Sequence, residues 1–285
     1  MALYLTVFRN STNSQIRGDH MGLFSGKKGI IMGVVNDFSL ATGIAKFLHA
    51  EGAQLGFSHL PDQDGKNRMA QRVQRVADPL GVSFVKPCDV SSDQQISEFF
   101  AAVQESFGQI DFLVHSIAFA PLEDIRCPTL EASRQGFHTA MDISVYSFIA
   151  VARAAAPLFE QGGAMVTLSY FGGEKVVHGY NMMGVCKAAL EMTTRYLALD
   201  LGPKNIRVNA VSAGPIKTLA SSAVGEFSKM LGLQADNAPL GRNITTLEVG
   251  KACAYLLSDL SSATTGEIMH VDGGFNIMSA VGRNG

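Results

Sequence analysis

Short apolar runs alternate with longer segments of helical periodicity along the chain from Lys28 onward. This alternation is typical of βαβ units, in which each strand is followed by a helix that leads to the next parallel strand. The apolar runs are continuous, which predicts strands that are covered by helices on both faces. The pattern therefore predicts an α/β fold built on an open, parallel sheet.

The individual elements can be placed by residue range. The predicted strands are Gly29–Gly33, Gln54–Ser58, Ser83–Val85, Phe112–Ser116, Ala164–Leu168, Arg207–Val211 and Glu267–Val271. The predicted helices lie around Leu40–Ala50, Lys66–Ala77, Gln94–Phe107, Leu130–Phe159, Asn181–Leu201 and Leu247–Leu257. We therefore expect a doubly wound, Rossmann-type parallel sheet of about seven strands, with right-handed crossovers and helices on both faces.

The patterned region contains no internal repeat, low-complexity tract or linker that would divide it. We expect a single domain over residues 21–285. Residues 1–20 lie outside the pattern, and Arg9 and Arg17 follow the apolar Ala2–Phe8 instead of preceding it, which is the wrong order for a secretory signal. We expect these twenty residues to be a disordered or non-native N-terminal extension.

Composition excludes several classes of partner. The formal net charge of −2 provides no basic field for nucleic acid or an anionic membrane, and no apolar run approaches the ~20 residues that span a bilayer. The four cysteines form no CxxC pair, which argues against both disulfides and zinc and favours a reducing cytoplasm. The seven histidines show no metal-ligand spacing, so we expect no metal.

A candidate dinucleotide site follows the first predicted strand. Gly33 permits a tight turn and a close backbone approach, and Ser39 can supply a hydroxyl near the helix N-terminus, where a phosphate binds. Gly43 is expected to let helix and strand pack closely. Because the usual G-x-G-x-x-G is absent, an ordinary glycine-containing βα turn remains open as a reading of this segment.

Two further segments fall at the carboxyl ends of later strands, where open α/β sheets bind ligands. These are Cys88-Asp89-Val90 and His115-Ser116-Ile117-Ala118. Asp89 could accept a hydrogen bond from an adenine amino group, or it could cap the following helix. The backbone near Ile117 could pack along the adenosine ribose.

Tyr180 and Lys187 are the candidate residues for chemistry. They stand seven residues apart at the start of a predicted helix, so the ~3.6-residue turn places them almost on one face. A phenol with a pKa near ~10 is a poor oxyanion partner until a nearby positive charge favours its ionised form. Lys187 could provide that charge and also hydrogen-bond ribose hydroxyls.

Taken together, these segments resemble the short-chain dehydrogenase/reductase superfamily and, within it, the enoyl-acyl-carrier-protein reductase branch. The resemblance covers about Met21 to Met278. Besides the segments above, it rests on Asp142-Ile143-Ser144, Leu168-Ser169-Tyr170, Arg207-Val208-Asn209-Ala210, Ser212-Ala213-Gly214-Pro215-Ile216 and His270-Val271-Asp272-Gly273-Gly274-Phe275.

Tyr170 is the residue that discriminates most sharply within the superfamily. Ordinary short-chain ketoreductases carry a catalytic Ser thirteen residues before the helix tyrosine, where this chain has Thr167. The enoyl reductases instead carry a second tyrosine ten residues before it, and Tyr170 occupies that position. The resemblance therefore implies reduction of an alkene instead of a carbonyl.

The resemblance implies NADH-dependent reduction of trans-2-enoyl thioesters, carried on acyl carrier protein, in type II fatty acid biosynthesis. The nicotinamide would deliver a hydride to C3, and Tyr180 would hydrogen-bond the resulting enolate oxygen. Lys187 would position the cofactor, and Tyr170 would seat the substrate. The C2 proton could come from Tyr180 or from solvent.

The composition of Pro215–Leu233 predicts a substrate lid that is mobile in the free enzyme and ordered with ligands, although a permanently ordered surface helix pair remains open. The resemblance implies a homotetramer, with the helices around Leu130–Phe159 and Asn181–Leu201 supplying the broad apolar faces, and a set of binding residues. NADH is expected over NADPH because Ser58-His59-Leu60-Pro61-Asp62 lacks an Arg or Lys for a 2′-phosphate. The expected cofactor contacts are Gly33, Ser39, Leu40, Asp89, Val90, Ser116, Ile117, Ala118, Lys187, Ile216 and Thr218. The expected substrate contacts are Ala120, Tyr170, Tyr180, Met183 and Phe227.

Two other functions remain open from the sequence. A short-chain carbonyl (ketoacyl) reductase would need Thr167 to serve as the missing serine. A noncatalytic NAD-binding protein could use the same fold, since fold alone does not establish activity.

Overall fold

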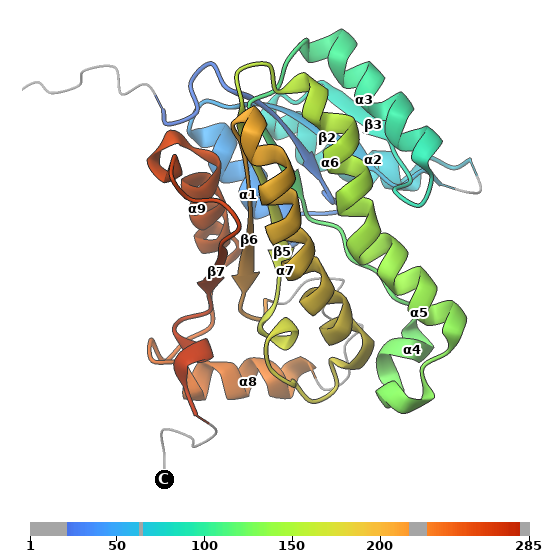
Figure 1. Ribbon diagram of the computed structural model, residues 1–285, viewed down its shortest axis with the longest axis vertical. Helices are drawn as coiled ribbons and strands as arrows, with labels where there is room; N and C mark the ends of the chain where they lie inside the picture. The colour runs from blue at the N-terminus through green and yellow to red at the C-terminus, as the bar shows by residue number, and fades with distance from the viewer. Residues whose placement is uncertain (1–21, 63–64, 217–226, 280–285) are drawn as a thin grey trace, which may run out of the picture.

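Seven strands form one parallel sheet at the centre of the molecule (Figure 1). The computed structural model describes residues 22–62, 65–216 and 227–279, and the side chains of residues 227–229 fall outside this description. The predicted extension at residues 1–20 and most of the predicted lid also lie outside the described residues. The described strands are β1 (Lys28–Met32), β2 (Gln54–His59), β3 (Phe84–Pro87), β4 (Phe112–His115), β5 (Gly163–Ser169), β6 (Ile206–Ala213) and β7 (Ile268–Val271).

The strand order β3-β2-β1-β4-β5-β6-β7 confirms the doubly wound prediction. The chain builds outward from β1 to β3, crosses back to place β4 beside β1, and then builds outward on the other side. Each predicted strand is present, with its ends displaced by no more than two residues from the described bounds.

Helices cover both faces of the sheet, as the apolar strands predicted. One face carries α1 (Leu40–Ala50), α2 (Arg68–Ala77) and α9 (Thr246–Leu257), and the other carries α3 (Asp93–Phe107), α6 (Ser147–Ala155) and α7 (Asn181–Leu201). Within β1, Ile30 and Met32 pack in the core beneath the second group, while Ile31 packs beneath the first. This alternation follows from the two-residue period of a strand.

Three further helices gather beyond the carboxyl ends of the strands. They are α4 (Leu122–Arg126), α5 (Arg134–Met141) and α8 (Phe227–Asn237). Figure 1 shows β6 and β7 running toward α8. These helices border the edge of the sheet at which doubly wound proteins bind ligands.

The prediction of one helix over Leu130–Phe159 is wrong in detail. Leu130 lies in a 3-10 turn, Thr129–Glu131, and Ser133 caps α5 by accepting a hydrogen bond from the Gly136 N–H at 2.9 Å. A π-helical turn, Asp142–Tyr146, then separates α5 from α6.

The helical stretch Arg134–Leu158 is long and apolar enough by composition to span a membrane, contrary to expectation, but 56% of its apolar window is buried inside the protein. A core helix passes this test equally well.

Gly43 serves a different contact from the one expected. A Cβ built on Gly43 would lie 2.4 Å from the Thr246 Cβ and 2.7 Å from the Thr246 carbonyl oxygen. The close partner is therefore the first turn of α9 and not a strand. Gly250 of α9 faces the Gly43 carbonyl in return, at 2.9 Å from a built Cβ, so the two glycines let α1 and α9 approach closely.

Gly43→Ala is expected to lower the free energy of unfolding by about 2 kcal/mol, since the added methyl group overpacks a contact made partly by backbone. The matched control is Gly202→Ala, because Gly202 has helical dihedrals and no atom within 4 Å of a built Cβ. Urea denaturation of both variants measures the difference. Equal stabilities for the two variants would contradict this account of the α1–α9 contact.

Candidate active site

The turns after β1 and β4 meet at Gly33 and Ser116. Gly33 has φ +95°, and a Cβ built on it would lie 2.0 Å from the Ser116 carbonyl oxygen. The Ser116 N–H donates to the Met32 carbonyl at 3.0 Å. Only glycine fits this position, because both the dihedral and the approach exclude a side chain. The two turns therefore form one floor for a ligand.

The first turn of α1 borders this floor. Ser39 is the N-cap of α1; its hydroxyl accepts the Thr42 N–H at 3.2 Å and donates to the Asn36 carbonyl at 3.1 Å. Leu40 begins the helix, and the first N–H groups of a helix have no carbonyl partner within it. This arrangement suits a pyrophosphate group.

Asp89 follows β3 and is half-buried. Its Oδ1 accepts the Ser91 N–H at 3.0 Å and the Ser91 hydroxyl at 2.7 Å. The N-cap of α3 is Ser92, so the alternative that Asp89 caps this helix is wrong. Asp89 instead shapes its own turn beside the buried Val90, and its role toward adenine stays a prediction.

A buried serine fixes the loop after β4. The Ser144 hydroxyl donates to the Phe119 carbonyl at 2.9 Å and accepts the Phe119 N–H at 3.0 Å. Ser144 lies in the π-helical turn, which differs from an α-helix in the direction of its side chains. The loop so held carries Ile117, Ala118 and the buried Ala120. The sequence flagged Ser144 within a motif but gave no sign of this role.

Tyr170 and Tyr180 lie together at the carboxyl end of β5. Their ring centroids are 4.7 Å apart at 70°, an edge-to-face contact. Tyr180 immediately precedes α7, and a Cβ built on Gly172 would lie 2.4 Å from its Cδ1. The phenol of Tyr180 is thus held between the other ring and the backbone of Gly172.

Burial raises the pKa of both phenols, that of Tyr170 to about 12 and that of Tyr180 further, with the Tyr170 phenolate as a second cause for Tyr180. The expectation that the charge of Lys187 favours ionised Tyr180 is therefore wrong, because burial decides the direction of this pKa and Lys187 is not among its causes. Tyr180 is a neutral phenol. A neutral phenol still donates a hydrogen bond, so the residue keeps its value as an oxyanion partner.

Lys187 is buried in α7 and is anchored to β5. Its Nζ donates to the Leu168 carbonyl at 2.7 Å. Burial lowers the pKa of Lys187 to about 8, although Cys186 and Glu191 act in the opposite direction. Glu191, one helical turn further on and also buried, accepts the Ser169 hydroxyl at 2.5 Å. Sequence reasoning missed this acidic neighbour, which has the i, i+4 spacing of an ion pair.

Thr167 does not face the site. It is fully buried in β5, and its hydroxyl donates to the His115 carbonyl at 3.1 Å. The His115 ring lies beside it, with Nδ1 3.2 Å from the Thr167 Oγ1 and Nε2 2.9 Å from the Ser147 Oγ. Burial and then the charge of Lys187 lower the pKa of His115 to about 3, so the imidazole is neutral. Thr167 is consequently unable to replace a catalytic serine.

The substrate side of the site is bordered by α8. The Tyr170 hydroxyl donates to the Met230 sulfur at 3.3 Å. The buried Gln234 donates to the Asp272 carbonyl at 2.8 Å and so ties α8 to the turn after β7. Phe227 begins α8, and its side chain lies outside the described residues, as does Thr218.

The remaining predicted contacts fall on either side of the nicotinamide end. Ile216 is half-buried just after β6 and packs against the core beneath α1 and α9. Met183 is buried in the core cluster against which Tyr180 packs. Its contact with the acyl chain of a substrate stays a prediction.

Among the residues that the structure describes, no three His, Cys, Asp or Glu side chains gather as a metal site.

The residues present fit a dinucleotide. The glycine floor at Gly33, the helix N-terminus at Ser39 and the buried cation of Lys187 lie along one edge of the sheet, in the order in which a dinucleotide would need them. Crevices at such reversal points of strand order are the usual dinucleotide sites. Fold and site together define a Rossmann-fold oxidoreductase.

Comparison with known proteins gives the family. The sequence profile described as enoyl-(acyl carrier protein) reductase matches residues 33–276. The chain is 47% identical to the NADH-dependent enoyl-acyl-carrier-protein reductase FabI of Nostoc sp. over 254 residues, which are 89% of this chain and 98% of that protein. The chain therefore belongs to the enoyl-acyl-carrier-protein reductase family.

Two solved structures support the same assignment. The enoyl-acyl-carrier-protein reductase of Anaplasma phagocytophilum, solved with NAD, is 47% identical with a TM-score of 0.86 over 91% of this chain and 98% of that one. The enzyme of Bacillus cereus, solved with NADP+ and indole naphthyridinone, is 44% identical with a TM-score of 0.86 over 91% and 100% of the chains.

Tyr180→Phe is expected to lower kcat with an enoyl thioester by about 100-fold, because it removes one preorganised oxyanion donor. Thr167→Val is the control, because it removes a hydroxyl of β5 that donates to the His115 carbonyl. The kcat of this variant should stay near the wild-type value. Steady-state NADH oxidation measures both, with circular dichroism to verify folding. A large loss of kcat in the folded Thr167→Val variant, or none in Tyr180→Phe, would refute these assignments.

Proposed function

We propose that this chain reduces the 2,3 double bond of trans-2-enoyl thioesters with NADH, as an enoyl-acyl-carrier-protein reductase of type II fatty acid biosynthesis. The observation that supports this most directly is the contact between Tyr170 and Tyr180, combined with a buried Lys187 and a buried Thr167 whose hydroxyl donates to the His115 carbonyl. A ketoreductase would need that hydroxyl at the substrate. The names of the relatives agree with the proposal.

The protein residues divide the work as follows. The nicotinamide, when bound, would supply the hydride for C3 of the substrate, and Tyr180 or solvent would supply the proton that C2 gains. Tyr180 donates a hydrogen bond from its neutral hydroxyl to the thioester oxygen, where negative charge develops, and this selective stabilisation lowers the barrier. Tyr170 packs edge-on against Tyr180 and seats the thioester. Lys187, whose ammonium group donates to the Leu168 carbonyl of β5, would hold the cofactor ribose.

The predicted contacts for the rest of the cofactor form one path. Gly33, Ser39 and Leu40 would bind the pyrophosphate, and Ser116, Ile117 and Ala118 would follow the adenosine half. Asp89 and Val90 would border the adenine. Ile216 and Thr218 complete the proposed nicotinamide end, with Thr218 outside the described residues.

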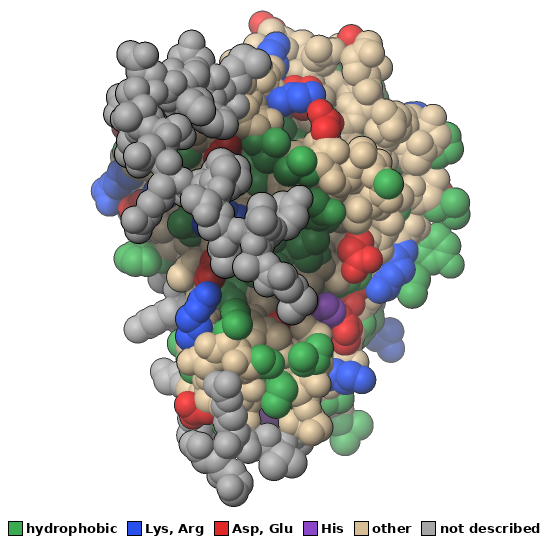
Figure 2. All heavy atoms as spheres, turned by 90° about the vertical axis from the view of Figure 1, so that its left-hand side faces the viewer, with side chains coloured by type: hydrophobic (Ala, Val, Ile, Leu, Met, Phe, Trp, Pro, Cys, Tyr) green, Lys and Arg blue, Asp and Glu red, His purple; other side chains and the backbone are tan. Residues whose placement is uncertain are grey.

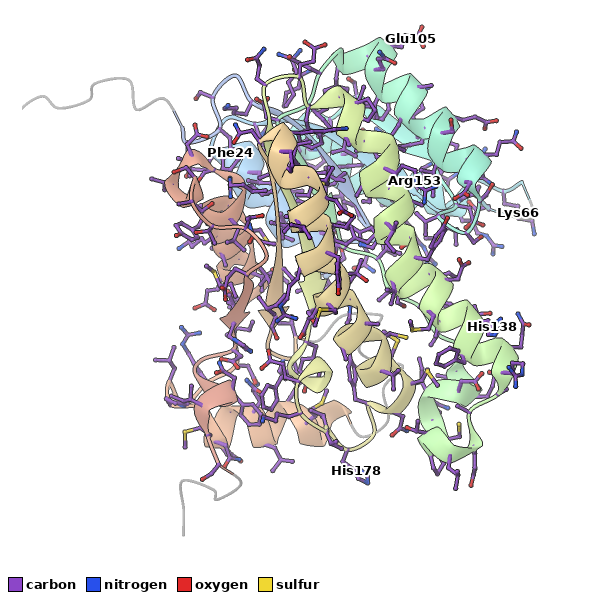
Figure 3. The ribbon with its side chains drawn as sticks, viewed as in Figure 1. Phe24, Lys66, Glu105, His138, Arg153 and His178 are labelled. Atoms are coloured by element: carbon purple, nitrogen blue, oxygen red, sulfur yellow. The ribbon has the colours of Figure 1, made fainter. Side chains whose placement is uncertain are left out.

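Selectivity for NADH over NADPH is proposed from the turn after β2. Asp62 lies in that turn, and its carboxylate accepts the Met69 N–H at 2.8 Å, which fixes a negative charge near the expected ribose 2′ position. Lys66 and Arg68 lie further along the chain: Arg68 begins α2, and Figure 3 shows Lys66 at the outer edge of the molecule. The 2′-phosphate of NADPH would therefore lie nearer to the carboxylate of Asp62 than to a basic side chain, which favours NADH.

The experiment is a panel of 3-ketoacyl and trans-2-enoyl thioesters, crotonyl and longer, assayed with NADH and with NADPH. Turnover of the enoyl thioesters, with NADH preferred, is expected because the site offers paired tyrosines and an acidic turn. Reduction of the ketoacyl thioesters alone would establish the carbonyl-reductase alternative. Tight NADH binding without any turnover would instead establish the noncatalytic one.

We also propose a cytoplasmic homotetramer that takes enoyl chains from acyl carrier protein. Exposed apolar side chains on α7 recur at Val185, Met192, Tyr196 and Leu199, with the partly exposed Ala189 between them. Their spacing of four and three residues forms a stripe like that of a helix that pairs with another helix. A second copy would cover this stripe.

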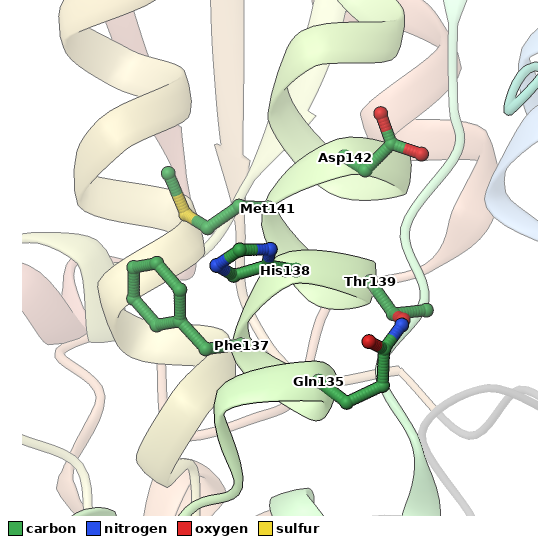
Figure 4. Close-up of a pocket in the computed structure, with 6 residues that line it drawn as sticks. All are labelled: Gln135, Phe137, His138, Thr139, Met141 and Asp142. Carbon is green, nitrogen blue, oxygen red and sulfur yellow. The ribbon is translucent and has the colours of Figure 1, made fainter.

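The surface beside α5 supports the same reading. Six residues of α5 and the following turn border an open hollow, and Figure 4 shows Phe137 on the side of the helix opposite Gln135 and Thr139. Phe137 is exposed. On the face shown in Figure 2, Lys and Arg side chains lie among Asp, Glu and hydrophobic side chains. The apolar sides of α5 and α7 are thus the proposed places for subunit contact.

Tyr196→Glu combined with Leu199→Glu is expected to reduce the solution mass below four copies of the 30.4 kDa chain, since it introduces charge into the stripe. Leu130→Glu is the control, because Leu130 is 97% exposed and lies outside the stripe. Light scattering at micromolar concentration measures the masses. A wild-type monomer, or an unchanged tetramer in the double variant, would contradict the proposed interface.

A substrate lid over residues 215–233 belongs to the same proposal. Its described part includes Met230, which contacts Tyr170, and the turn of α8 that precedes Gln234. Residues 217–226 lie outside the described part of the chain. The support is therefore the position of α8 over the tyrosine pair.

A further inference from the structure

Asn181, the residue after Tyr180, has a backbone conformation that non-glycine residues rarely adopt. Its φ is +38°, although it is the first residue of α7. Left-handed φ values cost an ordinary L-residue free energy, and Asn tolerates them better than most. Such strain persists only when surrounding contacts impose it.

The side chain of Asn181 provides those contacts. Its Nδ2 donates two hydrogen bonds, to the Ile125 carbonyl at 2.9 Å and to the Cys127 carbonyl at 2.8 Å. These carbonyls lie at the C-terminus of α4, where a helix leaves its last carbonyl groups without partners. One amide thus caps α4 and locks the first turn of α7.

The two hydrogen bonds of Asn181 affect the position of the catalytic phenol. A left-handed residue directly after Tyr180 sets the direction in which the chain enters α7, and so it sets the direction of the Tyr180 side chain. The ring then has little freedom, because Gly172 lies against one side and Tyr170 against the other. A small change in the backbone at residue 181 would move the hydroxyl relative to any substrate.

The same amide joins the two sides of the site. The α4 helix begins directly after Pro121, and the preceding residue is the buried Ala120 of the predicted substrate site. Asn181 therefore links the loop after β4, which Ser144 holds from its other side, to the tyrosine. No other hydrogen bond of the described residues links α4 to the first turn of α7 by side chain.

We propose that Asn181 is a positioning residue: its left-handed conformation, fixed by two hydrogen bonds to α4, aims the Tyr180 hydroxyl at the reacting thioester. This inference rests on the proposed function for its kinetic consequences. Its structural content is independent of the reaction, because it concerns the orientation of one ring.

The test separates the conformation from the hydrogen bonds. Asn181→Ala removes both and is expected to lower kcat for the enoyl thioester by about ten- to a hundredfold, the effect of a displaced catalytic group. Asn181→Gly loses the hydrogen bonds but adopts the left-handed φ without strain, so it should recover a clear part of the lost kcat. KM for NADH should change little in either variant.

The matched control is Asn205→Ala. Asn205 also has a left-handed φ, +56°, but it lies at the opposite end of β6 and far along the chain from the tyrosines. Its substitution should lower thermal stability without lowering kcat. A merely structural role for Asn181 would give the same result at both positions and would overturn the proposal.

A double-mutant cycle with Tyr180→Phe shows whether Asn181 acts through the phenol. In the Tyr180→Phe background, Asn181→Ala should cause little further loss of kcat, because the group that it positions is already absent. An undiminished loss in that background would overturn the proposal. If Asn181→Ala fails to fold, Asn181→Gly replaces it in the comparison with Asn205→Ala and in the double-mutant cycle. A wild-type kcat in Asn181→Gly, with the Tyr180 phenol unmoved, would also overturn the proposal.

A spectroscopic readout distinguishes failure of this inference from failure of the proposed function. The chain has six tyrosines, so the Tyr180 signal in a 13C-tyrosine NMR spectrum can be assigned by its loss in Tyr180→Phe. Asn181→Ala should shift this signal, whereas Asn205→Ala should leave it unchanged. An unshifted signal refutes the positioning role whether or not enoyl thioesters are turned over; a shifted signal in an enzyme without enoyl turnover supports it and refutes only the assigned reaction.

Discussion

The contact between the turns at Gly33 and Ser116 is the constraint on which the site depends. Strand order reverses between β1 and β4, which are neighbours in the sheet, so the turns that follow these two strands lie next to each other. A glycine at φ +95° lets them touch, with no room for a Cβ between Gly33 and the Ser116 carbonyl. Asp89, Ser116 and Tyr170 also lie in segments that follow strands of this sheet, so the register of the strands places them at the same edge as the floor.

Burial, and not charge, dominates the electrostatics of the tyrosine pair. It raises the pKa of Tyr170 and Tyr180 and lowers that of Lys187. Both phenols therefore keep their protons. The ammonium group of Lys187 donates a hydrogen bond to the Leu168 carbonyl of β5. A set of neutral, already oriented donors needs little reorganisation when charge develops on a substrate, which is the condition for effective oxyanion stabilisation.

The sequence was sufficient for the sheet because its strands are buried on both faces and read as continuous apolar runs. It was also sufficient for α1 and α7, whose predicted bounds match the described ones. The sequence was insufficient where tertiary contacts decide. The π-helical turn that aims Ser144, the α9 partner of Gly43 and the inward hydroxyl of Thr167 all depend on packing between distant segments.

The candidate site shows the same division. Residue type and spacing indicated Tyr170, Tyr180 and Lys187, and the structure brings the two rings together above the lysine's strand. Spacing alone gave the wrong direction for the pKa of Tyr180, since a helix periodicity contains no information about desolvation. Asn181 escaped notice for a related reason: a polar residue in a first helical turn is ordinary, and only its φ and its two acceptors on α4 distinguish it.

The contact between Tyr170 and Met230 shows how the site can keep a half-buried phenol hydrogen-bonded before substrate binds. An unpaired hydroxyl in such a place costs free energy, and the Met230 sulfur accepts its hydrogen bond at 3.3 Å. A thioether is a weak acceptor, so a thioester carbonyl that reached Tyr170 would gain more from the same donor. The methionine therefore stabilises the free site without competing strongly against the ligand that the site would bind.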